Sequence, residues 1–388
     1  MKITFYGLFL KRQGCYNSSI SCLCVILKQF KVRCHLMPLQ QPKIRAKIME
    51  PKMSIPDAAR FLNITSQAVL KKMKNNKLER QKVNNRVYFG HSTSNKLFNL
   101  SVSPSVIATQ IVKGGTGKST ITMAIAIRAN LYGLKVLCID LDQQANLSIL
   151  FGITDVENYH VMYDVIKSKG KLKIERNLIE ISTGLHLFPS KLENAALDDM
   201  ILIQGLGVDR VYKDIIIPLK DYYDLILIDC PPALGRSVAA AAHAADKIIS
   251  PVIPDKLCLT GLRLLHNLLE EIKESKYGRK IPYEIVYNRF DGRTNLSKEV
   301  LSSLLTSDIY KERLNPNYIR QCQEFSNSAA KKNSIYDSLI TSSAQEDIDS
   351  LTRNLLGLED IKNNSFDDEN QKRLIISVSS DELKPDGV

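Results

Sequence analysis

The sequence contains no apolar run long enough to cross a bilayer, since nothing approaches the roughly 20 residues that a transmembrane helix needs. The longest early candidate, residues 20–27 (ISCLCVIL), is short, is flanked by lysines and is not followed by a small-residue cleavage site. It predicts neither a membrane anchor nor a signal peptide. With 44% hydrophobic and 24% charged residues, the composition is typical of a globular protein, and we expect a cytoplasmic location.

Acidic residues are scarce at the start of the chain. The first 100 residues hold 19 Lys and Arg but only three acids, Glu50, Asp57 and Glu79. This local balance of +16 exceeds the net charge of +12, so the remaining 288 residues sum to −4. Such asymmetry favours a polyanionic partner for the basic part, most often nucleic acid. The alternative is a solvated basic segment that has no partner.

Paired cysteines are also missing, because no C-x-x-C occurs among the eight cysteines. Four cysteines lie in the first 34 residues, but their spacing and the single nearby histidine, His35, match zinc-binding patterns poorly. Cys138 and Cys230 stand in apolar, strand-like runs and are expected to be small core residues. We therefore expect free thiols rather than a metal centre.

The rest of the chain divides into segments of distinct character. Short β-branched runs alternate with helical periods over residues 106–358, which predicts an α/β domain with a doubly wound, mainly parallel sheet. Around it we expect a disordered leader or misassigned start at 1–48, a small basic module at 49–90, a polar linker at 91–105 and a mobile polar tail at 359–388.

The basic module has the pattern of two short helices followed by a hairpin. Ser54 is a good N-cap, Asn63 and Ile64 interrupt the apolar stripe, and Thr65 or Ser66 can cap a second helix. The module resembles winged helix-turn-helix domains related to the MerR class, with Asn84-Asn85 as the turn of the wing. This predicts DNA binding; the alternative is a helical hairpin that only packs against the protein. The candidate DNA contacts are Lys71, Lys72, Lys74, Arg80, Lys82 and Arg86.

A glycine-rich loop, ATQIVKGGTGKST at residues 108–120, follows the first strand-like run of the α/β domain. The common phosphate-binding loop is G-x-x-x-x-G-K-[ST], and Val112 stands where its first glycine would be. The remaining features fit a P-loop, because glycines allow the backbone to approach phosphates, Lys118 can reach the β- and γ-phosphates, and Ser119 can bind Mg²⁺. The predicted nucleotide contacts are Gly114, Gly115, Thr116, Gly117, Lys118, Ser119 and Thr120.

Three motifs in order resemble those of the ParA/MinD ATPases. KGGTGKST is similar to the deviant Walker A motif of that family, with its additional lysine, Lys113. CIDLDQQANLS, residues 138–148, resembles the second acidic motif, and LILIDCPPALG, residues 225–235, resembles the Walker B strand and its continuation. The resemblance covers about residues 105–355 and implies an ATPase that uses ATP and Mg²⁺ and acts as a homodimer.

The resemblance also implies roles for single residues. Lys113 matches the lysine that reaches the partner subunit's nucleotide, and Asp142 matches the carboxylate that positions the attacking water. Asp229 matches the Walker B acid, and Asp140 is expected to help organise the magnesium shell. For Asp142 and Asp229 the alternative is a purely structural role. Asn288 aligns with a position that often contacts adenine, although an asparagine at a strand end is frequently only a turn former. Gln143 departs from the family's proline.

The basic module, the missing C-x-x-C and the acidic C-terminal end favour a ParA-type segregation protein over membrane-cycling or iron–sulfur-carrying relatives. That resemblance implies a ParB-type partner, a specific operator for the module and non-specific DNA for the ATP-bound dimer, hence a location on the nucleoid. Candidate non-specific DNA contacts are Arg320, Lys331 and Lys332, which could equally be ordinary solvated charges. The alternative function is an ATP-responsive transcriptional regulator. A metabolic P-loop ligase is disfavoured by the module and by Lys113.

Overall fold

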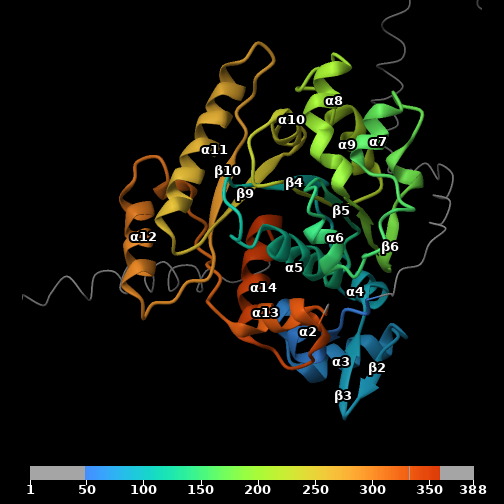
Figure 1. Ribbon diagram of the computed structural model, residues 1–388. Helices are drawn as coiled ribbons and strands as arrows, with labels where there is room; N and C mark the ends of the chain where they lie inside the picture. The colour runs from blue at the N-terminus through green and yellow to red at the C-terminus, as the bar shows by residue number, and fades with distance from the viewer. Residues whose placement is uncertain (1–48, 332, 359–388) are drawn as a thin grey trace, which may run out of the picture. The chain divides into compact units, whose positions relative to one another are not determined.

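A seven-stranded sheet forms the centre of the chain (Figure 1), with the strand order β10-β9-β4-β8-β5-β7-β6. The computed structural model describes residues 49–331 and 333–358. Neighbouring strands are parallel except β6, which pairs antiparallel with β7, and this confirms the expected mainly parallel sheet. The strands are β4 Ser105–Thr109, β5 Val136–Asp140, β6 Ile179–Ser182, β7 Leu185–Phe188, β8 Leu225–Asp229, β9 Lys247–Val252 and β10 Tyr283–Tyr287.

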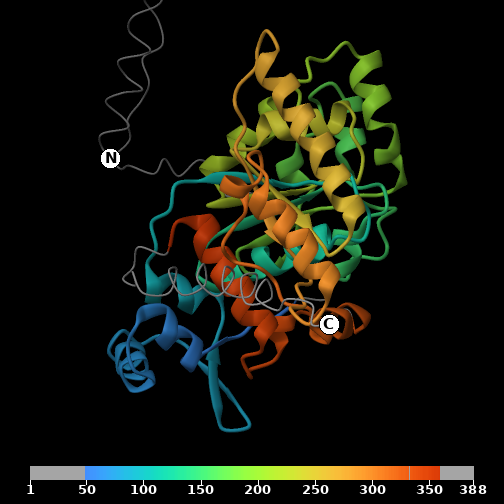
Figure 2. The same ribbon diagram turned by 90° about the vertical axis from the view of Figure 1, so that its left-hand side faces the viewer.

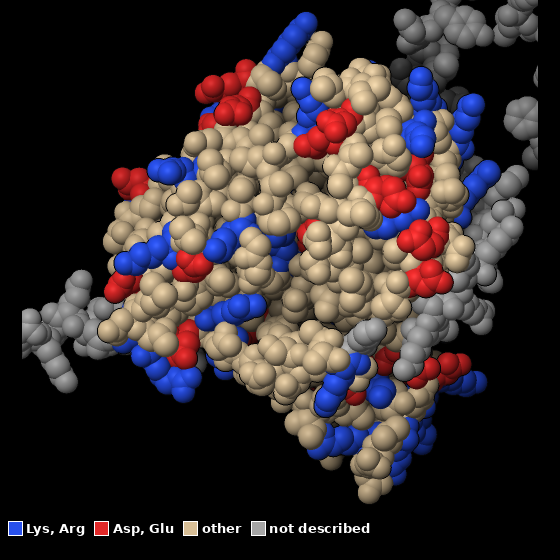
Figure 3. All heavy atoms as spheres, viewed as in Figure 1, with Lys and Arg blue, Asp and Glu red and all other residues tan. Residues whose placement is uncertain are grey.

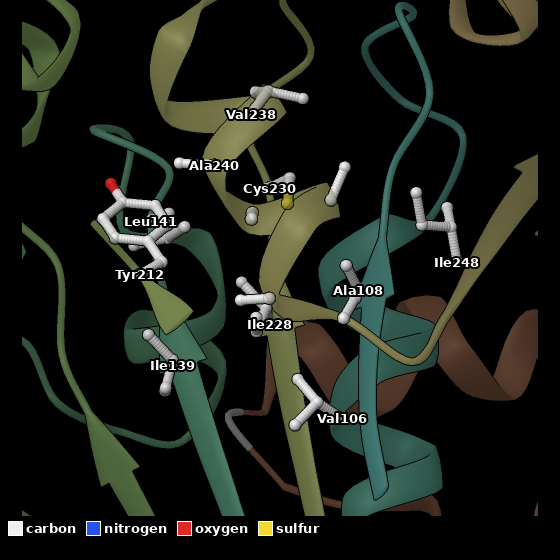
Figure 4. Packing of buried hydrophobic residues seen from close by; sticks show 14 of the residues in the cluster. Val106, Ala108, Ile139, Leu141, Tyr212, Ile228, Cys230, Val238, Ala240 and Ile248 are labelled. Atoms are coloured by element: carbon white, nitrogen blue, oxygen red, sulfur yellow. The ribbon is translucent and has the colours of Figure 1, made fainter. Parts of the chain in front are cut away.

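Both faces of the sheet are buried because successive strand residues point to opposite sides. In β4, Val106 and Ala108 belong to one buried cluster, whereas Ile107 belongs to the other. The first cluster, part of which Figure 4 shows, lies under α7 Met162–Lys167, α8 Leu197–Ile203, α9 Lys213–Ile216, α10 Arg236–Ala244, α11 Lys256–Glu274 and α12 Asn295–Thr306. The second lies under α5 Lys118–Leu131, α6 Asn146–Leu150 and α14 Ser343–Leu356; α13 spans Gln323–Ala330. None of the described helices is long and apolar enough to cross a membrane.

The segment before the sheet contains the two short helices and the hairpin that its sequence predicts. Helix α2 Ile55–Leu62 is capped by Ser54, and α3 Ser66–Asn75 is capped by Thr65, whose hydroxyl accepts from the Ala68 amide at 3.2 Å. The hairpin strands are β2 Gln81–Val83 and β3 Arg86–Phe89, and β1 Met53–Ser54 pairs with β3. Asn84 and Asn85 both adopt positive φ (45° and 64°), as a type I′ turn requires.

This N-terminal segment packs on the α5 and α14 side of the sheet (Figure 2). Phe61 of α2 stacks on Tyr132, just after α5, with ring centroids 4.5 Å apart. The Arg60 guanidinium lies 3.7 Å from the Glu346 carboxylate of α14. Helix α2 therefore contacts the end of the helix that starts at the glycine-rich loop.

The stretch that we expected to be a linker, residues 91–105, contains helix α4 His91–Phe98. Its Leu97 and Phe98 are buried, and the Phe98 ring lies 4.8 Å from that of Phe61. The sequence did not predict this helix, because residues 91–96 are polar and show no apolar pattern of helical period. The expected leader (1–48) and tail (359–388) lie outside the described residues.

Candidate nucleotide site

The glycine-rich loop runs from the end of β4 to the first turn of α5, so its backbone N–H groups lie at a helix N-terminus, where phosphates bind. Gly115 and Gly117 have φ of 75° and 92°, a region that L side chains rarely adopt. A Cβ on Gly117 would also lie only 2.6 Å from Nδ2 of Asn288. Gly117 is thus required both by its backbone angle and by a close neighbour.

Asn288, which follows β10, reaches the glycine-rich loop. Its Nδ2 donates to the Thr116 carbonyl at 2.8 Å, and its Oδ1 accepts from the Arg289 amide at 2.9 Å. The structure therefore brings this residue to the loop. In this structure its amide holds the loop backbone in place, and the adenine contact stays a prediction.

Lys118 is the first residue of α5 and is buried beneath the loop. Its Nζ donates to the Lys113 carbonyl at 3.3 Å. Burial lowers the pKa of Lys118, while the nearby carboxylates of Asp229 and Asp142 oppose this shift. The ammonium group therefore lies among the acids that the three motifs predicted.

Asp229 and Asp140 end the adjacent strands β8 and β5, where they are directly paired in register. Asp229 is fully buried, and neither of its carboxylate oxygens accepts a hydrogen bond from a described residue. Burial and Asp140 raise the pKa of Asp229, and the Ser119 hydroxyl and Lys118 act in the opposite direction. Unpartnered carboxylate oxygens beside a hydroxyl are hard ligands of the kind that Mg²⁺ prefers. Ser119 and Asp229 therefore fit a magnesium ion.

Unlike those of Asp229, the carboxylate oxygens of Asp140 already accept hydrogen bonds. It accepts from the Ser148 amide and hydroxyl at 2.9 and 2.8 Å and from the Asp142 amide at 3.1 Å. Burial raises its pKa to about 7 in spite of these bonds. These contacts make Asp140 an organiser of the loop that carries Asp142. Among the described residues, no group of three or more His, Cys, Asp and Glu could hold a metal ion by itself.

Asp142 lies in the loop after β5 and is buried. Its Oδ1 accepts from the Gln144 amide at 3.0 Å, and its carbonyl accepts from the Ser190 hydroxyl at 2.6 Å. The Ser190 amide in turn donates to the Ser148 hydroxyl at 3.1 Å. Ser148 and Ser190 thus fix this loop although Gln143 replaces the family's proline. No sequence motif pointed to Ser190, which lies 48 residues from Asp142.

Lys113 forms an ion pair with Asp255, with Nζ and Oδ2 3.1 Å apart. Asp255 is the N-cap of α11 and accepts from the Leu257 amide at 2.8 Å. That hydrogen bond, followed by the Lys113 contact, lowers the pKa of Asp255. Helix α11 also carries Gly261, where a Cβ would meet the Val112 carbonyl at 2.7 Å. Helix α11 therefore packs against the part of the loop that contains Lys113.

The predicted DNA-contacting residues differ in exposure and in whether they already bind another part of the protein. Lys71, Lys72 and Lys74 on α3, with Arg80 and Lys82, are exposed, and Figure 3 shows Lys and Arg gathered over this part of the surface. Arg86 instead donates to the Leu339 carbonyl at 3.0 Å. Arg320 is held by Asp347 at 2.6 Å and by Glu346, which raises its pKa and favours a structural role. Lys331 is exposed, and Lys332 lies outside the described residues.

Proteins similar to this chain include ATPases of the ParA type. A family model described as an AAA domain matches residues 104–281. An uncharacterized protein of Methanocaldococcus jannaschii is 32% identical over 204 residues, covering 51% of this chain and 78% of that protein. The cell division protein PomZ of Myxococcus xanthus is 29% identical, covering 63% of this chain and 75% of PomZ. The chromosome-partitioning ATPase Soj of Treponema pallidum is 29% identical, covering 50% and 75%.

Solved structures show the same fold. Cyanothece McdA in complex with ATP has a TM-score of 0.58 at 17% identity, covering 66% of this chain and 98% of that one. Cobyrinic acid a,c-diamide synthase from Mycobacterium smegmatis, with a bound ATP analogue and magnesium, has a TM-score of 0.56 at 22% identity, covering 65% and 94%. This fold therefore holds ATP analogues and Mg²⁺.

Proposed function

Because the chain belongs to the ParA/MinD family of P-loop ATPases, we propose that it is a DNA-segregation ATPase of the ParA type. It would dimerise around ATP, bind DNA non-specifically on the nucleoid, and be stimulated by a ParB-type centromere-binding partner. The observation that carries the proposal is the arrangement of the two lysines. Lys118 is buried among the proposed catalytic acids, whereas Lys113 lies in the loop and is paired with Asp255, the N-cap of the separate helix α11.

The site residues divide the work of ATP hydrolysis between them. Lys118 and the loop amides at Gly114–Gly117 would bind phosphate oxygens, and Ser119 and Asp229 would hold Mg²⁺. Bound Mg²⁺ supplies positive charge that the leaving phosphate oxygens need. Asp142 is held in place by Gln144 and Ser190 and would orient the attacking water. Lys113 would complete the site of the partner subunit, so we expect slow turnover in the free monomer.

The surface around the loop supports a dimer on this side of the molecule. Exposed leucines follow the carboxyl ends of three strands that alternate with β4 and β5 in the sheet: Leu192 after β7, Leu234 after β8 and Leu257 after β9. Exposed apolar side chains along one edge of a sheet are available for a protein–protein contact. They would meet their counterparts when Lys113 reaches the second nucleotide.

The N-terminal module would bind the operator of the protein's own gene. Its exposed lysines on α3, with Arg80 and Lys82 on the hairpin side, are placed to contact phosphates beside a groove-reading helix. Arg86 is occupied by Leu339, which leaves it as a weaker candidate. The second candidate function, an ATP-responsive regulator, draws support from the direct contact of α2 with the end of α5.

The test compares the wild type with Lys113→Ala and Lys118→Ala. ATPase rate and sedimentation velocity would be measured with Mg-ATP or Mg-ADP, with and without non-specific duplex DNA. We expect the wild type to dimerise with ATP and to hydrolyse faster on DNA, Lys118→Ala to lose ATP binding, and Lys113→Ala to bind ATP but stay monomeric. A Lys113→Ala protein that dimerises and hydrolyses normally would contradict the cross-subunit role.

Inheritance of the replicon that carries the gene separates the two candidate functions. A segregation ATPase requires Lys118 for stable inheritance, and a regulator does not. If cells with Lys118→Ala inherit the replicon normally while the protein still binds its operator, the regulator is the correct function.

A further inference from the structure

The loop that follows Asp229, residues 230–235 (CPPALG), is weakly held by its own backbone. Pro231 and Pro232 have no N–H group, and no backbone amide of residues 233–235 donates to another described residue. At its start, the Cys230 amide donates to the Thr109 carbonyl at 3.2 Å. In its middle, the Gln110 side chain donates to the Ala233 carbonyl at 2.8 Å. Asp198 accepts from the Ser237 amide at 2.7 Å in the first turn of α10, two residues after the loop.

Gln110 directly follows strand β4 and lies three residues before Lys113. Its backbone amide donates to the Ile249 carbonyl of β9 at 2.9 Å. Its backbone is therefore fixed in the sheet, while its side chain extends to Ala233. The contact joins the phosphate-binding loop to the loop that begins beside the magnesium residue Asp229.

Burying the side-chain amide of Gln110 at this position is energetically unfavourable. The residue is 1% exposed, and its Oε1 has no hydrogen-bond partner among the described residues. A buried polar atom without a partner is destabilising, and an apolar side chain of similar size would avoid that cost. Such groups in folded proteins call for an explanation other than stability.

We propose that Gln110 is a positioning residue for ATP hydrolysis. By holding the Ala233 carbonyl, Gln110 keeps the 230–235 loop at a fixed distance from the base of the loop that carries Lys113. The 230–235 loop presents the exposed Leu234, and this hydrogen bond joins the middle of that loop to the base of the nucleotide loop, in addition to the backbone bond from the Cys230 amide to the Thr109 carbonyl at 3.2 Å. This inference rests on the proposed ATPase function and adds a residue that none of the three motifs contains.

The first test uses Gln110→Met, which keeps the length of the side chain and removes the donor. Gln345→Met is the matched control, because Gln345 is a buried glutamine whose Nε2 holds the Ile335 carbonyl at 2.6 Å in a different part of the chain. We expect Gln110→Met to lower kcat about tenfold, equivalent to about 1.4 kcal/mol, with KM for ATP within about twofold of the wild type. Gln345→Met should lower Tm and leave kcat unchanged.

The second test reads the position of the loop directly. The chain contains no Trp, so Leu234→Trp introduces a single Trp, in this loop, which can be excited selectively in the presence of the tyrosines. In the nucleotide-free protein, adding Gln110→Met should increase acrylamide quenching of this Trp, while adding Gln345→Met should not. Gln110→Asn, whose amide is one methylene too short to reach Ala233, should act like Gln110→Met and keeps the test available if the methionine variant does not fold.

The outcomes separate this inference from the proposed function. Wild-type kcat and unchanged Trp quenching in both Gln110 variants would overturn the positioning role. An equal loss of kcat in Gln345→Met would also overturn it, because the effect would then be one of stability. If the wild type hydrolyses no more ATP than Lys118→Ala, the proposed ATPase function itself fails.

Discussion

The ion pair between Lys113 and Asp255 competes with the role that we propose for Lys113 at the partner subunit. The lysine must leave Asp255 before it can reach a second nucleotide, and the pair is about one third exposed on each side (28% and 33%). Exposed ion pairs contribute about 0.2–1 kcal/mol. Asp255 therefore sets a small cost on dimerisation rather than blocking it.

We predict that Asp255→Asn strengthens the ATP-dependent dimer about twofold to fivefold. Asparagine keeps the N-cap of α11 and its bond from the Leu257 amide, and it removes only the charge that holds Lys113. The dimer Kd would be measured by sedimentation velocity in Mg-ATP. Glu299→Gln is the control, because it breaks another exposed pair of the same helix end, Lys256–Glu299 at 3.0 Å, without touching Lys113. A dimer that is weakened by Asp255→Asn would contradict the competition.

At the residue scale, the sequence motifs identified the candidate site residues. They did not identify the residues that hold those side chains and loops in position. Lys118 and Asp229 lie close together, because the loop after β4 and the end of its parallel neighbour β8 meet at one edge of the sheet. Asp255, Ser190 and Gln110 contribute through contacts across 142, 48 and 123 residues of sequence. Contacts at such separations depend on the three-dimensional packing, and one sequence carries no local signal for them.

At the element scale, helices α5 and α14 are joined by a largely buried charge cluster. The Arg128 Nε donates to Asp349 at 2.6 Å, and the Arg353 Nη2 lies 2.8 Å from the same carboxylate. Tyr132 also donates to Asp349. Burial alone would raise the pKa of Asp349, but Arg128 and Arg353 outweigh it and hold the pKa at about 2. Because Arg128 and Tyr132 lie at the end of α5 that contacts α2, this cluster also supports the docking of the N-terminal module.

We predict that Asp349→Asn destabilises the protein by about 3 kcal/mol at neutral pH, because two guanidinium groups lose their partner. An acid whose pKa is lower in the folded state stabilises above its unfolded value, near 4, and this contribution is lost as the pH falls toward 2. The Tm gap between wild type and Asp349→Asn should therefore be full at pH 6 and close between pH 4 and pH 2, as followed by circular dichroism. Asp308→Asn, which removes an exposed partner of Lys311, should show no such gap. A gap that stays constant over this range would refute the assignment.

The elements themselves were predicted better than their packing. Caps at Ser54 and Thr65 and the Asn84-Asn85 turn gave α2, α3 and the hairpin, because capping and turn chemistry are local. Helix α4 was missed, because its polar residues hide the buried face of Leu97 and Phe98. The packing of α2 through Phe61 on Tyr132 could not be predicted either. A single sequence does not show which aromatic residues are buried or which of them contact one another.

At the scale of the whole molecule, the proposed DNA-binding module and the proposed dimer surface lie in different places. The N-terminal module lies on the α5 and α14 side, and the exposed leucines lie at the carboxyl edge, next to the nucleotide loop. Helix α11 offers a way to test that edge, because a strongly exposed residue lies near each of its ends. Leu257 is 62% exposed in its first turn, and Tyr277, three residues after Glu274, is 64% exposed. The 19-residue helix between them is about 28 Å long at 1.5 Å per residue.

We predict that Leu257→Glu abolishes the ATP-dependent dimer, because a charge would be buried at the edge where the two subunits meet. Tyr277→Glu introduces the same charge at a site of equal exposure on the far end of the helix and should leave the dimer intact. Sedimentation velocity in Mg-ATP would measure the dimer, and binding of a fluorescent ATP analogue to monomers would show that both variants keep the nucleotide site. If Tyr277→Glu breaks the dimer and Leu257→Glu does not, the subunits meet at the opposite edge of the sheet. Lys113 could not then reach the second nucleotide.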